Sequence, residues 1–348
     1  MIAVWEEVSF GGFPRRCAFA PMARLRVFQI AKLVTRDIDP SHDVEVSTLD
    51  AHINKMLAAA TDALKTPVAP YSDLEIGSIK QIYEGMKHSH ATVRQLLGNG
   101  QNDPRSVDAL AISRLQLETL YSLCLIFEQP GFTARFVKNG WKKPYIRFLL
   151  QREESRNLKR FGDVVQQLEE ALEGLRRQAG VTDEEKMTVE YEELGKPLPP
   201  GFVPSAIQRF PLPSVIISLV RDPTTVAMLQ RFYPEYEYLC NFTHSSMEGW
   251  LVRTMLDHRS PYRRLLEEQA GEQGIEKVFM KQVALPAMLY SFIGVAQACA
   301  ELTRLYPNSY DLLAKTVEGW EWLIEDSLLG CAIWERRTRA LLHVLSQG

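Results

Sequence analysis

The sequence has few cysteines, and their arrangement excludes two common uses of the residue. The five cysteines lie far apart in 348 residues and form no CxxC pair. An odd and scattered set of this kind is neither a disulfide framework nor a zinc-site spacing. The simplest prediction is therefore a protein of the reducing cytoplasm.

The chain also lacks an excess of charge of one sign. Its 40 Lys and Arg residues nearly balance 43 Asp and Glu residues, so the formal net charge is −3. A chain without an overall basic field is not steered as a whole towards nucleic acid or anionic lipid. This balance argues against a dedicated electrostatic DNA binder.

Motifs of the common nucleotide-binding and hydrolytic enzymes are missing as well. The sequence contains no GxxxxGK[ST] phosphate loop, no GxGxxG after a strand, no GxSxG elbow and no HExxH helix. Zinc-finger spacing is also missing. We accordingly predict neither a metal nor a cofactor.

One long run has no formal charge, and it raises the question of a membrane. The run VALPAMLYSFIGVAQACA spans residues 283–300, which is near the lower length limit for a spanning helix. Pro286, Gly294 and Gln297 interrupt its apolar character. We expect a core helix that is buried on all sides, and no membrane contact.

Helical periodicity dominates the rest of the sequence, where strand signals are scarce. Apolar residues recur three and four positions apart in segments such as DALAISRLQLETLYSLCLIFEQ. The sequence predicts an all-α protein, a multi-helix bundle. Its core helices are expected at 106–128, 142–178, 224–245 and 283–302.

Composition divides the chain into four parts. Residues 1–21 lack the features of a signal peptide and precede a natural start at Met22, so we expect a disordered tail or an upstream extension. Residues 180–214 combine an acidic first half with six prolines, which predicts an irregular connection rather than helix. This connection joins an N-terminal helical part, 22–179, to a C-terminal helical part, 215–348, that packs on it.

A regular apolar repeat marks the segment just before this connection. Large apolar residues recur in steps of 3, 4, 3, 4 and 3 among Lys, Arg, Glu and Gln. They are Leu158, Phe161, Val165, Leu168, Leu172 and Leu175. The pattern predicts a long amphipathic helix packed on its own domain. The alternative is a protruding arm that contacts an unknown protein partner or forms a homodimer through 158–175.

The stretch YEYLCNFTHSSMEGW contains the first set of candidate site residues. Cys240, His244 and Glu248 lie at i, i+4 and i+8, and Tyr236 precedes them by one turn, so a helix would align all four. A thiol beside an imidazole is the chemistry of a cysteine nucleophile. No helix N-terminus or Gly-rich setting activates this thiol, however. The favoured interpretation is a histidine hydrogen-bonded across helices, with Cys240 as an apolar filler.

A second set of polar residues lies within an apolar helix. Arg114 and Glu118 are four residues apart in AISRLQLETLYSL. If they are partly buried, both charges need partners, and a histidine from another helix is a suitable one. The two sets together predict a polar centre made of Arg114, Glu118, Tyr236, Cys240, His244 and Glu248.

Two short patterns in these sets carry a resemblance. The first is an Arg-x-x-x-Glu helix, here Arg114 and Glu118, and the second is a Tyr-x-x-Leu-(Ser/Cys)-x-x-x-His helix, here Tyr236 to His244. Over residues 80–260 the chain resembles a bacterial family of helical domains of unknown function. The resemblance implies a helical fold with a polar centre and no particular reaction. We therefore expect a bacterial, cytoplasmic interaction or defence-associated module without enzymatic activity.

The alternative hypothesis is an RNA-cleaving enzyme. The chain is distantly similar to HEPN-type helical ribonucleases, which use Arg-x(4–6)-His on a helix, because RTMLDH runs from Arg253 to His258. In such an enzyme the histidine is the acid or base and the arginine steadies the phosphate, usually across a dimer. The catalytic candidates are His244, Arg253 and His258, and RNA is a partner only under this hypothesis. A nuclease needs these groups in an open groove, whereas a structural clamp buries them.

Overall fold

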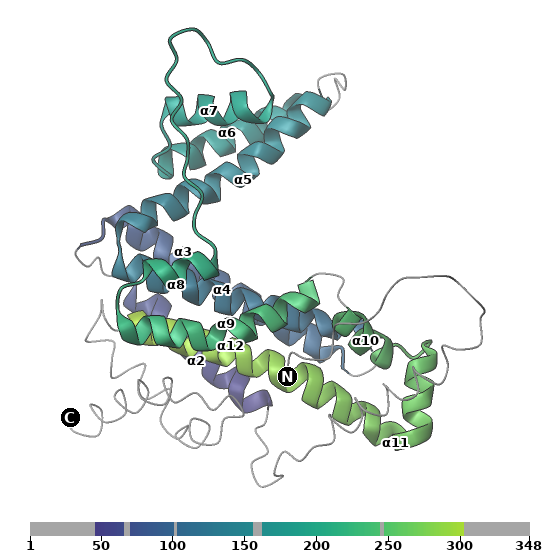
Figure 1. Cartoon of the computed structure of the whole chain (residues 1–348). Coiled ribbons are helices and arrows are strands. Elements are labelled where there is room, and N and C mark those ends of the chain that lie inside the picture. The colour runs from purple at the N-terminus through teal and green to yellow at the C-terminus, as the bar shows by residue number, and fades with distance from the viewer. Residues whose placement is uncertain (1–45, 66–69, 101–102, 156–161, 244–246, 303–348) are drawn as a thin grey trace, which may run out of the picture.

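The computed structural model describes residues 46–65, 70–100, 103–155, 162–243 and 247–302. Within these ranges the chain is helical and has no strand, which confirms the all-α prediction. The helices form a body, residues 46–136 and 210–302, from which an arm, residues 137–209, projects (Figure 1). The predicted extension at 1–21 lies outside the described residues.

Helix α4, Asp108–Glu128, lies at the centre of the body. Every residue from Leu120 to Phe127 is buried, because other helices cover α4 on several sides. Its neighbours are α12 (Leu285–Leu302), α3 (Asp73–Gly98) and α9 (Pro223–Thr243), and α2 (Val46–Ala63) packs on α12 and α3. A helix that is apolar on most faces is stable only in such surroundings.

Close packing joins α4 to α12. The Ser113 hydroxyl donates to the Ala287 carbonyl at 2.8 Å. A Cβ atom added at Gly294 would lie 3.0 Å from both the backbone carbon and the Cβ of Gln116. The absence of a side chain at Gly294 therefore allows the two helix backbones to approach each other.

Two described helical stretches are long and apolar enough to cross a membrane, Pro104–Glu128 and Gln282–Leu302. Inside the structure, 67% and 78% of the residues in their most apolar windows are buried. The second stretch contains the expected core helix of residues 283–300, and α12 occupies most of it. Core helices of water-soluble proteins pass the same test of length and composition, so the two stretches are only weak evidence for a membrane.

Shorter elements complete the body. They are the 3₁₀ turn η1 (Pro104–Val107), α8 (Pro213–Leu219), α10 (Met247–Leu256), α11 (Pro261–Phe279) and the π-helical turn η3 (Met280–Ala284). Among these, α10 contacts η1 and α11, while α8 lies against α4 and α9.

The arm has a small hydrophobic core of its own. It contains most of α5 (Gly131–Ser155), together with α6 (Gly162–Gln178), α7 (Asp183–Glu193) and an extended segment that returns to α8 (Figure 1). Trp141 and Tyr145 stack with ring centroids 4.4 Å apart, and the Trp141 indole donates to the Leu172 carbonyl at 3.0 Å. The hydrogen bond from Trp141 holds α6 against α5.

The core helix predicted at 142–178 is wrong, because two helices occupy this range. Helix α5 ends at Ser155, α6 begins at Gly162, and the two pack on each other. An apolar repeat with steps of three and four fits one long helix and two paired helices equally well, since both bury the same stripe.

The irregular segment predicted at 180–214 is wrong in its first half, where α7 forms. The Thr182 hydroxyl accepts from the Glu185 N–H at 3.2 Å, and the Glu185 carboxylate accepts from the Thr182 N–H at 2.9 Å. This capping box and the acidic first turn stabilise the start of a helix. The prolines begin only at Pro197, and no helix occurs between Leu194 and Leu212.

The buried residues are also distributed differently from the predicted parts of the chain. One core joins α2, α3 and α4 to α8, α9, α10, α11 and α12, so helices from both sides of 180–214 share it. The arm's core spans Trp141 to Ile207 and therefore crosses the predicted boundary at 180. The proline-rich segment thus belongs to an arm that is inserted into the body, rather than to a linker between two halves.

Candidate functional site

Four of the six predicted polar-centre residues meet between α4 and α9. One terminal nitrogen of Arg114, Nη1, lies 3.5 Å from the Tyr236 hydroxyl and 3.5 Å from the Cys240 sulfur. The guanidinium carbon lies 5.5 Å from the centre of the Tyr236 ring, within range of a cation–π interaction. The two helices pack side by side, and the polar centre crosses their interface.

Glu118 supplies the countercharge on the same helix as Arg114. Its Oε2 lies 3.1 Å from Arg114 Nη2. The Arg114 side chain is 19% exposed and the Glu118 side chain 39%, so the pair lies at the edge of the interface. Solvent screens a pair at such a position, which therefore contributes less than a fully buried pair.

The Tyr236 phenol remains protonated in this setting. Burial, followed by the nearby Glu118 carboxylate and Cys240, raises the pKa of Tyr236 to about 12. The ring also lies 6.0 Å from those of Tyr121 and Tyr233, measured between centroids. At neutral pH Tyr236 is therefore an uncharged hydrogen-bonding group that packs beside two other tyrosine rings.

Glu248 does not continue the stripe along α9. Helix α9 ends at Thr243 and α10 begins at Met247, so Glu248 lies on a different helix from Cys240. The Thr243 hydroxyl donates to the Cys240 carbonyl at 2.7 Å, a local bond typical of a helix end. His244 lies outside the described residues.

The proposed ribonuclease pair is not arranged on one helix. Arg253 lies on α10 and forms an ion pair with Asp108 at the start of α4, at 2.5 Å. His258 follows the end of α10 at Leu256, and its side chain is 65% exposed. Asp257, 4.0 Å from the His258 ring, is the acidic group that pairs with it. Arg253 is thus engaged in joining α10 to α4.

The described residues include no group of three or more His, Cys, Asp or Glu side chains that could hold a metal ion.

None of the family models, curated proteins or solved structures compared with the chain matches it.

The sequence interpretation missed a buried histidine. His90, the last residue of HSH at 88–90, is fully buried, with Nε2 2.7 Å from Asp50 Oδ1. Burial lowers the pKa of His90, although the hydrogen bond to Asp50 opposes the shift. The signal was present in the sequence, because His90 continues the buried positions Tyr83 and Met86 at helical spacing.

Proposed function

We propose that this protein is a non-enzymatic binding module, in which the polar centre is a structural clamp and the arm carries the contact surface. The observation that carries this proposal is an exposed apolar stripe on α6. Val164 is 61% exposed, Leu168 40% and Leu175 49%. Solvent-exposed apolar stripes on projecting helices are typical of protein–protein contacts.

The clamp hypothesis follows from how the guanidinium of Arg114 is used. Its partners are groups of the protein itself, namely Glu118, Tyr236 and Cys240, and its side chain is largely buried. A general acid or phosphate ligand must instead face an open groove. These contacts support a role in holding α9 against α4.

The stripe on α6 lies beside the face that packs in the arm's core. Val164, Leu168, Ala171 and Leu175 follow steps of 4, 3 and 4, so they lie on one face of the helix. Leu172 is only 4% exposed and belongs to the arm's core. The arm therefore does not need the exposed stripe for its own packing.

A second copy of this chain is the partner that the α6 surface fits. Exposed Glu170 lies at the midpoint of the helix, and exposed Arg177 lies at its end. When two such helices pair in opposite directions about a twofold axis, each copy contributes the same apolar stripe to the contact. This self-complementarity supports a homodimer through α6.

Sedimentation equilibrium of wild type and of the Val164→Glu/Leu168→Glu variant tests the proposal. We expect a wild-type dimer that becomes monomeric in the double variant, because two carboxylates would be buried without partners. Val215→Glu, on half-exposed Val215 of α8, is the matched control and should remain dimeric. A monomeric wild type, or a variant that remains dimeric, would contradict the assignment.

An assay of RNA cleavage tests the absence of enzymatic activity. We expect no cleavage by wild type, and no change for His258→Ala. Cleavage that is lost in Arg253→Ala or His244→Ala at unchanged thermal stability would instead establish the ribonuclease hypothesis. The Arg114→Met variant should lose about 1–3 kcal/mol of unfolding free energy, because it leaves polar groups of the clamp without partners.

A further inference from the structure

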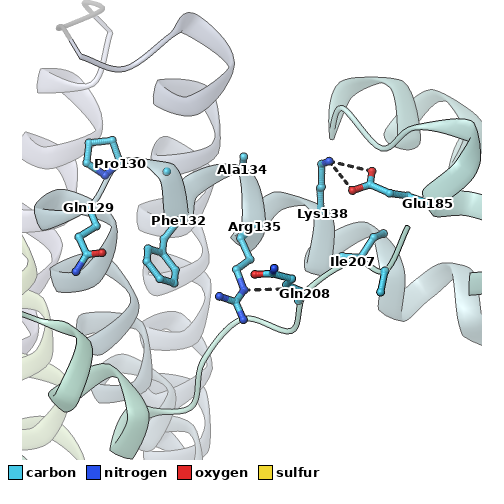
Figure 2. Close-up of a pocket in the computed structure, with 11 residues that line it drawn as sticks. Gln129, Pro130, Phe132, Ala134, Arg135, Lys138, Glu185, Ile207 and Gln208 are labelled. Atoms are coloured by element: carbon cyan, nitrogen blue, oxygen red, sulfur yellow. Dashed lines mark hydrogen bonds and ion pairs between the residues drawn. The ribbon is translucent and has the colours of Figure 1, made fainter. Parts of the chain in front are cut away.

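An open groove lies where the arm joins the body. It has a volume of about 550 Å³ and lies between the first turns of α5 and the extended residues 206–208 (Figure 2). Phe132 and Ile207 contribute apolar surface, while Arg135, Lys138 and Gln208 contribute polar groups. The groove is distinct from both the polar centre and the exposed stripe of α6.

One of the two cations in the groove is already neutralised. Lys138 Nζ donates to both carboxylate oxygens of Glu185, at 2.7 and 2.9 Å. One of those oxygens also accepts from the Thr182 N–H in the capping box. This ion pair holds the start of α7 against α5 and adds no net charge to the groove.

The other cation, Arg135, has no carboxylate partner among the described residues. Its Nε donates to the Gln208 carbonyl at 3.4 Å, and its guanidinium carbon lies 5.5 Å from the centre of the Phe132 ring. Figure 2 shows its side chain between Phe132 and Gln208. These contacts orient the guanidinium and leave its two terminal nitrogens as donors.

The opposite wall is fixed in place by the same carbonyl. Asn139 Nδ2 donates to the Gln208 carbonyl at 2.6 Å, and Ile207 is anchored in the arm's core at 5% exposure. Phe210, just beyond, packs on Phe132 and Phe136. The groove is therefore formed before any ligand arrives, which lowers the entropic cost of binding.

We propose that this groove binds an organic anion in which a carboxylate is joined to an apolar group. The planar fork of Arg135 matches a carboxylate with two parallel hydrogen bonds. The apolar part lies against Phe132 and Ile207. Either a free aromatic or aliphatic acid or an acidic residue within a partner's peptide provides this chemistry.

Isothermal titration with three probes tests the inference on the full-length protein. Phenylacetate represents a free acid, the amidated peptide N-acetyl-Phe-Asp represents a peptide source, and benzylamine is a cation of similar shape. We expect phenylacetate or the peptide to bind with a Kd in the millimolar range or below, and benzylamine not to bind. The tighter of the two acids identifies the source.

Two arginine variants on the same helix sharpen the test. Arg135→Gln should weaken binding of the acid by at least about tenfold, because it removes the charged fork. Arg147→Gln, at an exposed position on α5 that does not line the groove, should leave the affinity unchanged. Equal binding of benzylamine, equal affinity in Arg135→Gln, or no binding of either acid at about 10 mM would overturn the inference. None of these outcomes depends on self-association through α6.

Discussion

Gly294 provides a direct test of how closely α12 packs on α4. In Gly294→Ala the new Cβ would lie 3.0 Å from the backbone carbon and Cβ of Gln116, and 3.2 Å from its carbonyl oxygen. Contacts of this length are tighter than about nine in ten of those that real Cβ atoms make, and two of these three neighbours are backbone atoms. Gln116 cannot move freely, since its side chain also donates to the Met86 carbonyl at 2.8 Å.

The expected change in the unfolding free energy of Gly294→Ala is the sum of two opposing effects. Replacing glycine by alanine inside a helix is worth about 1 kcal/mol in favour of folding. Overpacking in a close interface costs about 1–3 kcal/mol. Gly294→Ala should therefore range from neutral to a loss of about 2 kcal/mol. Gly85→Ala, in α3 with no neighbouring atom within 4 Å of the new Cβ, should gain about 1 kcal/mol.

Urea unfolding of the two variants beside wild type provides the measurement. The propensity effect is the same in both variants, so the difference between them isolates the close approach of the helices. A difference of about 1–3 kcal/mol is expected, with Gly294→Ala the less stable. If Gly294→Ala stabilises the protein as much as Gly85→Ala does, the packing of α12 on α4 is looser than described.

Two further predictions concern the arm and the pH dependence. Thr182→Ala should lower the free energy of unfolding by about 1 kcal/mol and speed amide exchange in α7, because it removes the helix cap. Thr92→Ala, at an exposed position of α3, is the control and should have neither effect. Because the pKa of His90 is lowered in the folded protein, the imidazole is protonated at a higher pH in the unfolded chain than in the folded chain. The neutral, buried His90 therefore favours folding above about pH 6.5, and this stabilisation is lost as the pH falls below that value. Urea titrations between pH 5 and 8 should accordingly give a shallower profile for His90→Gln, and an unchanged slope would exclude His90 as the cause.

The fold class could be predicted from the sequence because periodicity of apolar residues decides it locally. The helices expected at 106–128 and 283–302 are present almost as predicted, since their apolar residues exceed what one face can hold. The arm could not be predicted in the same way. Whether α5 and α6 form one helix or two depends on contacts such as Trp141 with Leu172, which are distant in sequence.

The candidate site was predictable only in part. Tyr236 and Cys240 lie one turn apart on α9, and their contact with Arg114 depends on the packing of α9 against α4. The partner of Arg253 was not predictable, because Asp108 is distant in sequence and belongs to another helix. No sequence motif marks Arg135, because the orientation of its side chain depends on a hydrogen bond to the backbone carbonyl of Gln208.

The insertion of the arm also bears on the order in which the protein folds. The rings of Phe136 and Phe210 lie with centroids 5.1 Å apart, so the chain leaves the body and returns to it at one place. A long unfolded segment between α4 and α8 would make the pairing of these helices entropically costly. An arm that folds first through its local contacts brings Phe136 and Phe210 together and shortens that loop. We therefore expect the arm to fold before α8 packs against α4.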